Sequence, residues 1–172
     1  TLGALVITLV HLTSDALSAD RRDDRVAHWR YAPKLALGWV VASKWLTTML
    51  SAALPLSAMF AALLHLEQAG TPSALGIARS PWHNGAVFLL CGGAVVACGL
   101  FAAALAACAE CAAFQAHLLA LPFLGAVVIF GAQALAPGAS AAGGALTLLT
   151  ATALVLIPLG CGFASRLLRV MG

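Results

Sequence analysis

The chain has 172 residues, of which 62% are hydrophobic and only 9% charged, and its mean hydropathy is +1.00. A soluble domain is ~45–50% apolar, so this composition excludes a water-soluble globular fold. The formal net charge of +3 is unremarkable, and we expect no nucleic-acid partner. Because the apolar runs are continuous rather than alternating, they predict an all-α, polytopic helical membrane protein and not a β-barrel.

The first apolar segment covers about residues 2–17 and is predicted to be a transmembrane span. Thr1 already lies inside this apolar stretch, and no basic region precedes it as in a secretory signal peptide. We therefore expect the printed sequence to start part-way through a longer protein.

Most of the charge lies in residues 20–34, which we call the charged segment. Of the 15 charged side chains (9 basic and 6 acidic), 9 lie between Asp15 and Lys34. The signs are mixed, whereas an anchor for anionic lipids is almost purely basic. Aromatic residues follow the charges, as in a helix lying in the membrane interface. This pattern favours docking of a cytoplasmic protein over a solvated loop that faces headgroups. The predicted docking residues are Asp20, Arg21, Arg22, Asp23, Asp24, Arg25, Trp29 and Arg30.

The second apolar run, residues 35–66, is too long for one span. As a helix it would measure ~48 Å, against a hydrocarbon core of ~30 Å. Lys44 lies close to two tryptophans, a combination that marks a membrane interface. We therefore predict an interfacial lead-in over residues 35–45 and a span over about residues 46–66.

Three further spans are predicted downstream, separated by a Gly- and Pro-containing loop, a very short turn and a second flexible loop. They cover about residues 84–108, 112–135 and 145–165. The first of them is rich in small residues, which let helix backbones approach closely in lipid. Kinks are predicted at Pro55, Pro122 and Pro158. They could let helices rearrange during a working cycle or serve only local packing, and the sequence leaves this open.

The basic residues predict the orientation of these five spans. Seven of them fall on the side of the charged segment and the C-terminus, and only Arg79 falls on the other side. By the positive-inside rule, the charged segment and the C-terminus lie in the cytoplasm or the mitochondrial matrix. The expected location is the bacterial or mitochondrial inner membrane.

Few residues indicate chemistry. The C-x-x-C spacing at Cys108–Cys111 fits a redox or metal site, but two small side chains at a tight turn are the simpler interpretation. His65 and His83 flank the loop of residues 67–83 and could lie near a haem or a metal, although interfacial histidines facing headgroups are favoured. We predict no resident metal, no catalytic residue and no directly bound cofactor. A partner chain would have to bind any ATP, since no phosphate-binding glycine-rich motif occurs.

The order of the short motifs resembles the CcmB family, the permease subunit of the haem-handling ABC transporter in cytochrome c maturation (system I). The similar stretches are RDD at Arg22–Asp24, SKW at Ser43–Trp45, ALPLSAMFAALL at Ala53–Leu64, ALPFLGAVVIFGA at Ala120–Ala132 and the terminal LIPLGCGFASRL. Each is short and mostly apolar, so their order and spacing carry the resemblance. It covers nearly the whole chain and starts at the family's second span.

This resemblance implies an ABC-type permease with six spans, five of them visible in this sequence, and an interfacial coupling helix. It implies that the chain is not itself an enzyme and couples a partner's ATP hydrolysis to release of a haem-loaded chaperone. The implied partners are an ATPase of the CcmA type, haem-handling membrane subunits of the CcmC and CcmD types and a chaperone of the CcmE type.

A structural role is the competing hypothesis. The family's Gly-Ser-Leu-Glu run after the acidic pair is replaced here by DRVAHWR. The chain could therefore be a membrane subunit of a larger respiratory or assembly complex without transport activity. An independent small-molecule carrier is disfavoured, because no polar site at mid-membrane depth is visible in the sequence.

Overall fold

The computed structural model describes residues 2–14, 34–70, 80–109, 113–136 and 139–170. Within these ranges every element is a helix, which confirms the all-helical prediction. The elements are α1 (Leu2–Ser14), α4 (Lys34–Thr48), the π-helical turn η1 (Met49–Ala53), α5 (Leu54–Gly70), α6 (Pro81–Ala109), α7 (Ala113–Leu135) and α8 (Ala139–Val170).

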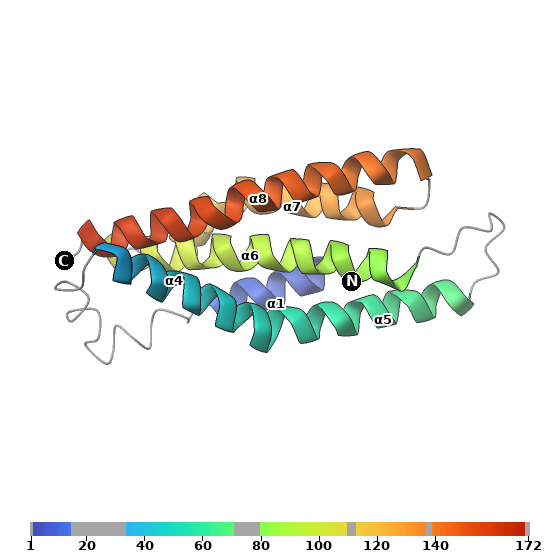
Figure 1. Ribbon diagram of the computed structural model, residues 1–172, viewed down its shortest axis with the longest axis horizontal. Helices are drawn as coiled ribbons and strands as arrows, with labels where there is room; N and C mark the ends of the chain where they lie inside the picture. The colour runs from blue at the N-terminus through green and yellow to red at the C-terminus, as the bar shows by residue number, and fades with distance from the viewer. Residues whose placement is uncertain (1, 15–33, 71–79, 110–112, 137–138, 171–172) are drawn as a thin grey trace.

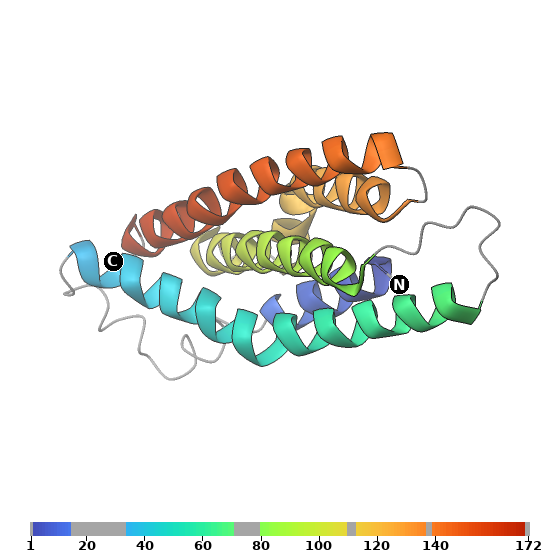
Figure 2. The same cartoon turned by 45° about the vertical axis from the view of Figure 1, so that its right-hand side comes forward.

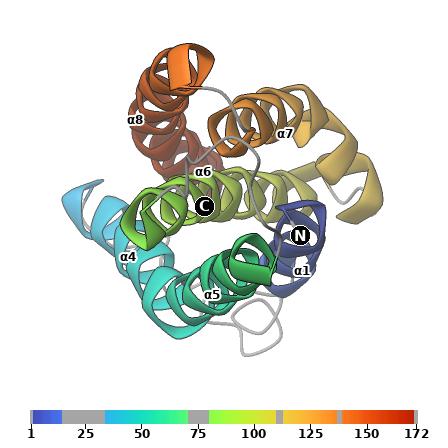
Figure 3. The same ribbon diagram turned by 90° about the vertical axis from the view of Figure 1, so that its right-hand side faces the viewer.

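Helix α6 forms the centre of the bundle. Viewed end-on, the other helices surround it (Figure 3). Every residue from 91 to 100 is buried, and α6 packs on α8, α7, α1 and α5. Over this stretch α6 is apolar on all sides, so it has no polar face of the kind that a surface helix turns toward solvent.

The helices run back and forth along one axis, so the start of α4 and the end of α8 lie at the same end of the bundle (Figure 1). The two ends contact each other through a small hydrophobic cluster, in which Leu37 of α4 packs with Ala104 of α6 and Leu168 of α8. The end of α5 and the start of α6 lie at the opposite end. In the sequence, the charged segment directly precedes α4.

Within the described ranges, three helical stretches are long and apolar enough to cross a membrane. They are Leu37–Glu67, Pro81–Ala106 and Gly143–Arg169, while the apolar stretches of α1 and α7, Leu2–Thr13 and Ala120–Leu135, are shorter. The outer helices also expose large apolar side chains, such as Ile7, Leu66 and Leu154. Length, composition and exposed apolar surface indicate a membrane-embedded protein. The count of five spans and the orientation stay predictions.

The predicted lead-in of residues 35–45 is part of the bundle. Leu37 and Val41 are each only 2% exposed, and both pack against α6 and α8. The helical path runs without a break from α4 through η1 into α5. Lys44 and its flanking tryptophans mark a chemical boundary on this path, but they do not end the helix.

Glycines at helix crossings allow backbones to approach closely. A Cβ atom on Gly160 of α8 would lie 2.7 Å from the backbone oxygen of Ala97 in α6. A Cβ atom on Gly99 of α6 would lie 2.6 Å from the Cβ of Thr13 in α1. Side chains at these two positions would push α8 and α1 away from α6, so close helix packing depends on glycine there.

A hydrogen bond joins α4 to the central helix. The indole nitrogen Nε1 of Trp45 donates to the backbone oxygen of Gly93 at 3.1 Å. That carbonyl belongs to a helix whose small residues leave its backbone accessible from the side. Trp45 therefore anchors the path just before it bends.

We expect Gly160→Ala to lower the free energy of unfolding by about 1–3 kcal/mol, the usual cost of forcing extra atoms into a packed contact. The matched control is Gly162→Ala on the same helix, where nothing lies within 4 Å of an added Cβ. The control should be neutral or slightly stabilising, since alanine favours helix more than glycine does. Unfolding of both variants in detergent micelles, followed by circular dichroism, measures the difference. Equal effects would contradict the close approach.

We also expect Trp45→Phe to destabilise the bundle by about 1 kcal/mol, because a partly buried hydrogen bond between helices is lost. Trp39→Phe is the control, since Trp39 lies on the same helix and is 74% exposed. The same unfolding assay compares the two. A loss of equal size in the control would show that the hydrogen bond is not the cause.

Candidate functional site

The eight predicted docking residues of the charged segment, Asp20 to Arg25 with Trp29 and Arg30, lie outside the described residues. Their role stays a prediction. Cys111 also lies outside them. Among the residues that the structure describes, no group of three or more His, Cys, Asp or Glu could hold a metal ion.

The predicted kink at Pro55 falls next to the π-helical turn η1. The N–H of Leu54 donates to the carbonyl of Met49, five residues earlier rather than four. In a regular helix, Pro55 could not donate an N–H to the carbonyl of Ser51, and its ring would clash with that carbonyl. A wider turn just before Pro55 relieves the clash. The path from α4 to α5 changes direction at this point (Figures 1 and 2).

The other two prolines lie inside long helices. Pro122 belongs to α7 and Pro158 to α8, and both are exposed. Neither ends its helix, because the helical assignment continues on both sides. Pro158 also lines one of the cavities described below.

The two predicted haem-proximal histidines have different surroundings. The Nε2 atom of His83 lies 3.0 Å from the carbonyl oxygen of Ala134, so its ring is turned toward α7. His65 on α5 is exposed. A role near haem stays a prediction for both residues.

Asn84 is a buried polar residue that sequence reasoning missed. Its side chain is 0% exposed, and neither its oxygen nor its nitrogen has a hydrogen-bond partner among the residues that the structure describes. It lies in the first turn of α6, directly after His83. The hydroxyl of Ser57 on α5 is likewise buried and unsatisfied. An amide in an otherwise apolar segment was the available sequence signal, but only the fold shows that it points inward.

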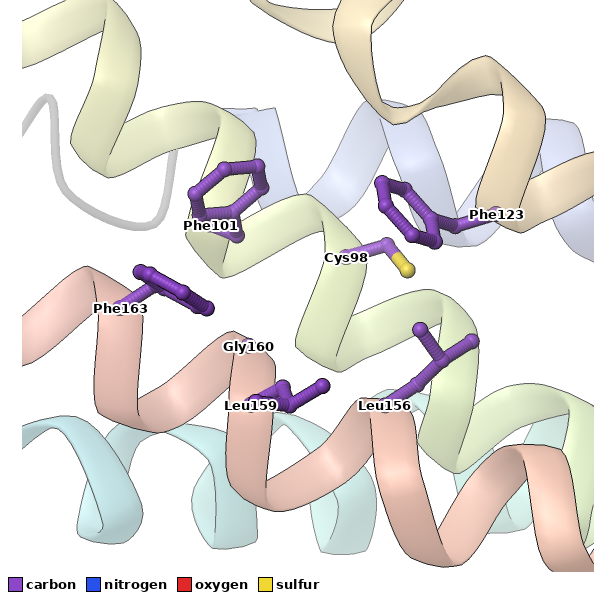
Figure 4. A pocket seen from close by; sticks show the side chains of 7 residues that line it. All are labelled: Cys98, Phe101, Phe123, Leu156, Leu159, Gly160 and Phe163. Carbon is purple, nitrogen blue, oxygen red and sulfur yellow. The ribbon is translucent and has the colours of Figure 1, made fainter.

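An apolar cavity of about 260 Å³ opens between α6, α7 and α8 (Figure 4). Its described lining consists of Cys98, Phe101, Phe123, Leu156, Leu159, Gly160 and Phe163. Cys98 and Leu156 are buried, whereas Phe123, Leu159 and Phe163 are about half exposed and stand at the mouth. An engineered cavity of ~150 Å³ with similar walls stays dry and binds benzene. The walls here suit a hydrocarbon and offer nothing to a charged group.

A second cavity, of about 200 Å³, continues along α8. Its described lining is Pro158, Leu159, Gly162, Phe163 and Arg166. Leu159 and Phe163 line both cavities, so the two adjoin. We call them together the α8 groove, which changes along its length from purely apolar walls to a cationic end. From the sequence, this stretch was interpreted only as a family-like motif and a kink.

Comparison of the chain with models of known protein families, with curated proteins and with solved structures found no match.

We expect Asn84→Leu to raise the free energy of unfolding by about 1–3 kcal/mol, because it removes a buried amide that has no partner. The control is Thr13→Val, which removes a buried hydroxyl that donates to the carbonyl of Leu9 at 2.8 Å. That variant should be neutral or destabilising. Unfolding in detergent micelles checks both, and destabilisation by Asn84→Leu would show that the amide has a partner in solution.

Proposed function

We propose that this chain is the membrane permease subunit of an ABC transporter complex of the CcmB type, acting in haem delivery for cytochrome c maturation. One observation carries the proposal, namely the order and spacing of the motifs from RDD at Arg22–Asp24 to the terminal LIPLGCGFASRL. The chain itself would hydrolyse nothing. An ATPase of the CcmA type would bind ATP, and coupling would end in release of a haem-loaded chaperone.

The packing of α4 supports a coupling role for the charged segment. This segment runs directly into α4, whose buried residues Leu37 and Val41 contact both α6 and α8. A force applied by a partner to the charged segment would therefore act on α4 and, through it, on two long helices. The wide turn η1 offers a place where α4 can tilt relative to α5.

The anchor at Trp45 sets where such a tilt would act. Trp45 lies near the end of α4, just before η1, and its hydrogen bond to Gly93 fixes this part of the helix. Motion of the start of α4 would therefore rotate the helix about Trp45.

The proposed cycle thus needs no charged path across the membrane within this subunit. It transmits mechanical work between the partner and the helices.

Charge reversal in the coupling segment tests the proposal. The complex carrying Asp23→Arg, Asp24→Arg and Arg25→Asp should lose stimulated ATPase activity and cytochrome c yield, because like charges would face each other across the docking surface. Arg79→Asp is the control, since this residue is predicted to lie on the opposite side of the membrane. Purification of the complex with its partners, followed by ATP hydrolysis and haem-staining assays, measures both readouts.

The same purification separates the permease from its alternative. Recovery of an ATPase with phosphate-binding motifs supports the permease. Recovery among respiratory or assembly subunits without an ATPase would overturn it and support a structural subunit.

A further inference from the structure

We propose that the α8 groove binds one anionic phospholipid, with the lipid phosphate on Arg166 and one acyl chain in the apolar cavity between α6, α7 and α8. The proposal does not rest on the transport function. It rests on the shape, chemistry and length of the groove.

The apolar part of the groove fits a hydrocarbon chain. Gly160 and Cys98 form part of its wall, and aromatic rings stand around its mouth (Figure 4). The rings of Phe101 and Phe163 meet edge-to-face at 6.1 Å, which narrows the cavity on that side. Because Phe123, Leu159 and Phe163 are about half exposed, the mouth opens on the outer surface of the bundle. In a membrane, that surface faces lipid.

The cationic end fits a lipid phosphate. Arg166 is the only charged residue in the described lining, and it is exposed at the end of the groove. A guanidinium binds phosphate oxygens through two parallel N–H bonds. Arg166 lies near the C-terminal end of α8. By the predicted orientation, this end lies at the cytoplasmic or matrix leaflet, which carries the anionic lipids.

The length of the groove matches a single leaflet. Leu156 and Arg166 are ten positions apart in α8, and helix geometry converts this to ~15 Å along the axis. Half of a ~30 Å hydrocarbon core is the same distance. A lipid whose phosphate lies at Arg166 would therefore place its acyl chain beside Leu156 near the bilayer centre. A transmembrane helix of another subunit needs a broader face of small residues, whereas protruding phenylalanines border this groove.

Two variants, each with a matched control, test the charge at the end of the groove and the open space beside it. Arg166→Gln removes the proposed phosphate ligand, and Arg169→Gln removes an exposed arginine that does not line the groove. Gly162→Leu adds a large apolar side chain at a residue that lines the groove, where nothing lies within 4 Å of an added Cβ. Gly125→Leu on α7 is its control, since that position is equally open and lies outside the described lining.

Native mass spectrometry of the full chain, released from detergent with phosphatidylglycerol or phosphatidylcholine of identical palmitoyl-oleoyl chains, tests the proposal. The unmodified chain should retain one phosphatidylglycerol, preferred about fivefold, as expected for one basic residue at an anionic headgroup. Arg166→Gln should abolish that preference, whereas Arg169→Gln should keep it. Gly162→Leu should lose both lipids, whereas Gly125→Leu should keep both.

Other outcomes would overturn the site. If the unmodified chain retained the two lipids equally, the headgroup charge would play no part in binding. If Arg166→Gln and Arg169→Gln lowered the preference for phosphatidylglycerol equally, the preference would come from general attraction to a basic surface and not from the groove. A dimer without bound lipid would show that a second copy of the chain covers the groove instead.

Discussion

The bundle depends on how closely its helices approach α6. Gly160 allows α8 to lie against the backbone of Ala97, and Gly99 allows α1 to lie against the same helix through Thr13. In lipid, helices gain little from leaving an apolar solvent, so van der Waals contact between close backbones is a main source of association. Small residues on both sides of a crossing provide that contact. Small residues of α6 at these crossings, Ala97 and Gly99, let α8 and α1 lie close to the central helix.

The same small residues leave backbone groups and space that larger side chains then use. Trp45 reaches the carbonyl of Gly93 because no side chain covers it. Gly162 leaves the surface of α8 open beside Phe163. Tight contact at Gly160 and open space at Gly162 therefore occur within two residues of the same helix. Gly160 allows α8 to pack closely on α6, and Gly162 helps to form the α8 groove.

Polar groups are few in the described bundle, and those that are buried stand out. The hydroxyl of Thr13 donates to the carbonyl of Leu9 in its own helix, as threonine hydroxyls in helices often do. Asn84 and Ser57 have no such partner. Burying a polar group without a hydrogen bond costs free energy, so both side chains lower the stability of the fold. Trp45 differs from them, because its indole N–H donates to the carbonyl of Gly93. The π-helical turn η1 before Pro55 is a second local departure from regular helix, and it directly follows α4.

The sequence by itself determined the helical class, the membrane environment and the approximate positions of the apolar segments, because continuous apolar runs leave no other way to satisfy backbone hydrogen bonds in lipid. It also placed Pro55 beside an irregular turn, since proline acts on its own preceding residues. Tertiary structure alone decided which face of each helix is buried. It joined residues 35–45 to the bundle, turned Asn84 inward and His83 toward Ala134, and brought Cys98, Phe123 and Leu156 together from three helices. These contacts depend on how helices rotate and cross, and the periodicity of uniformly apolar helices contains almost no information on rotation.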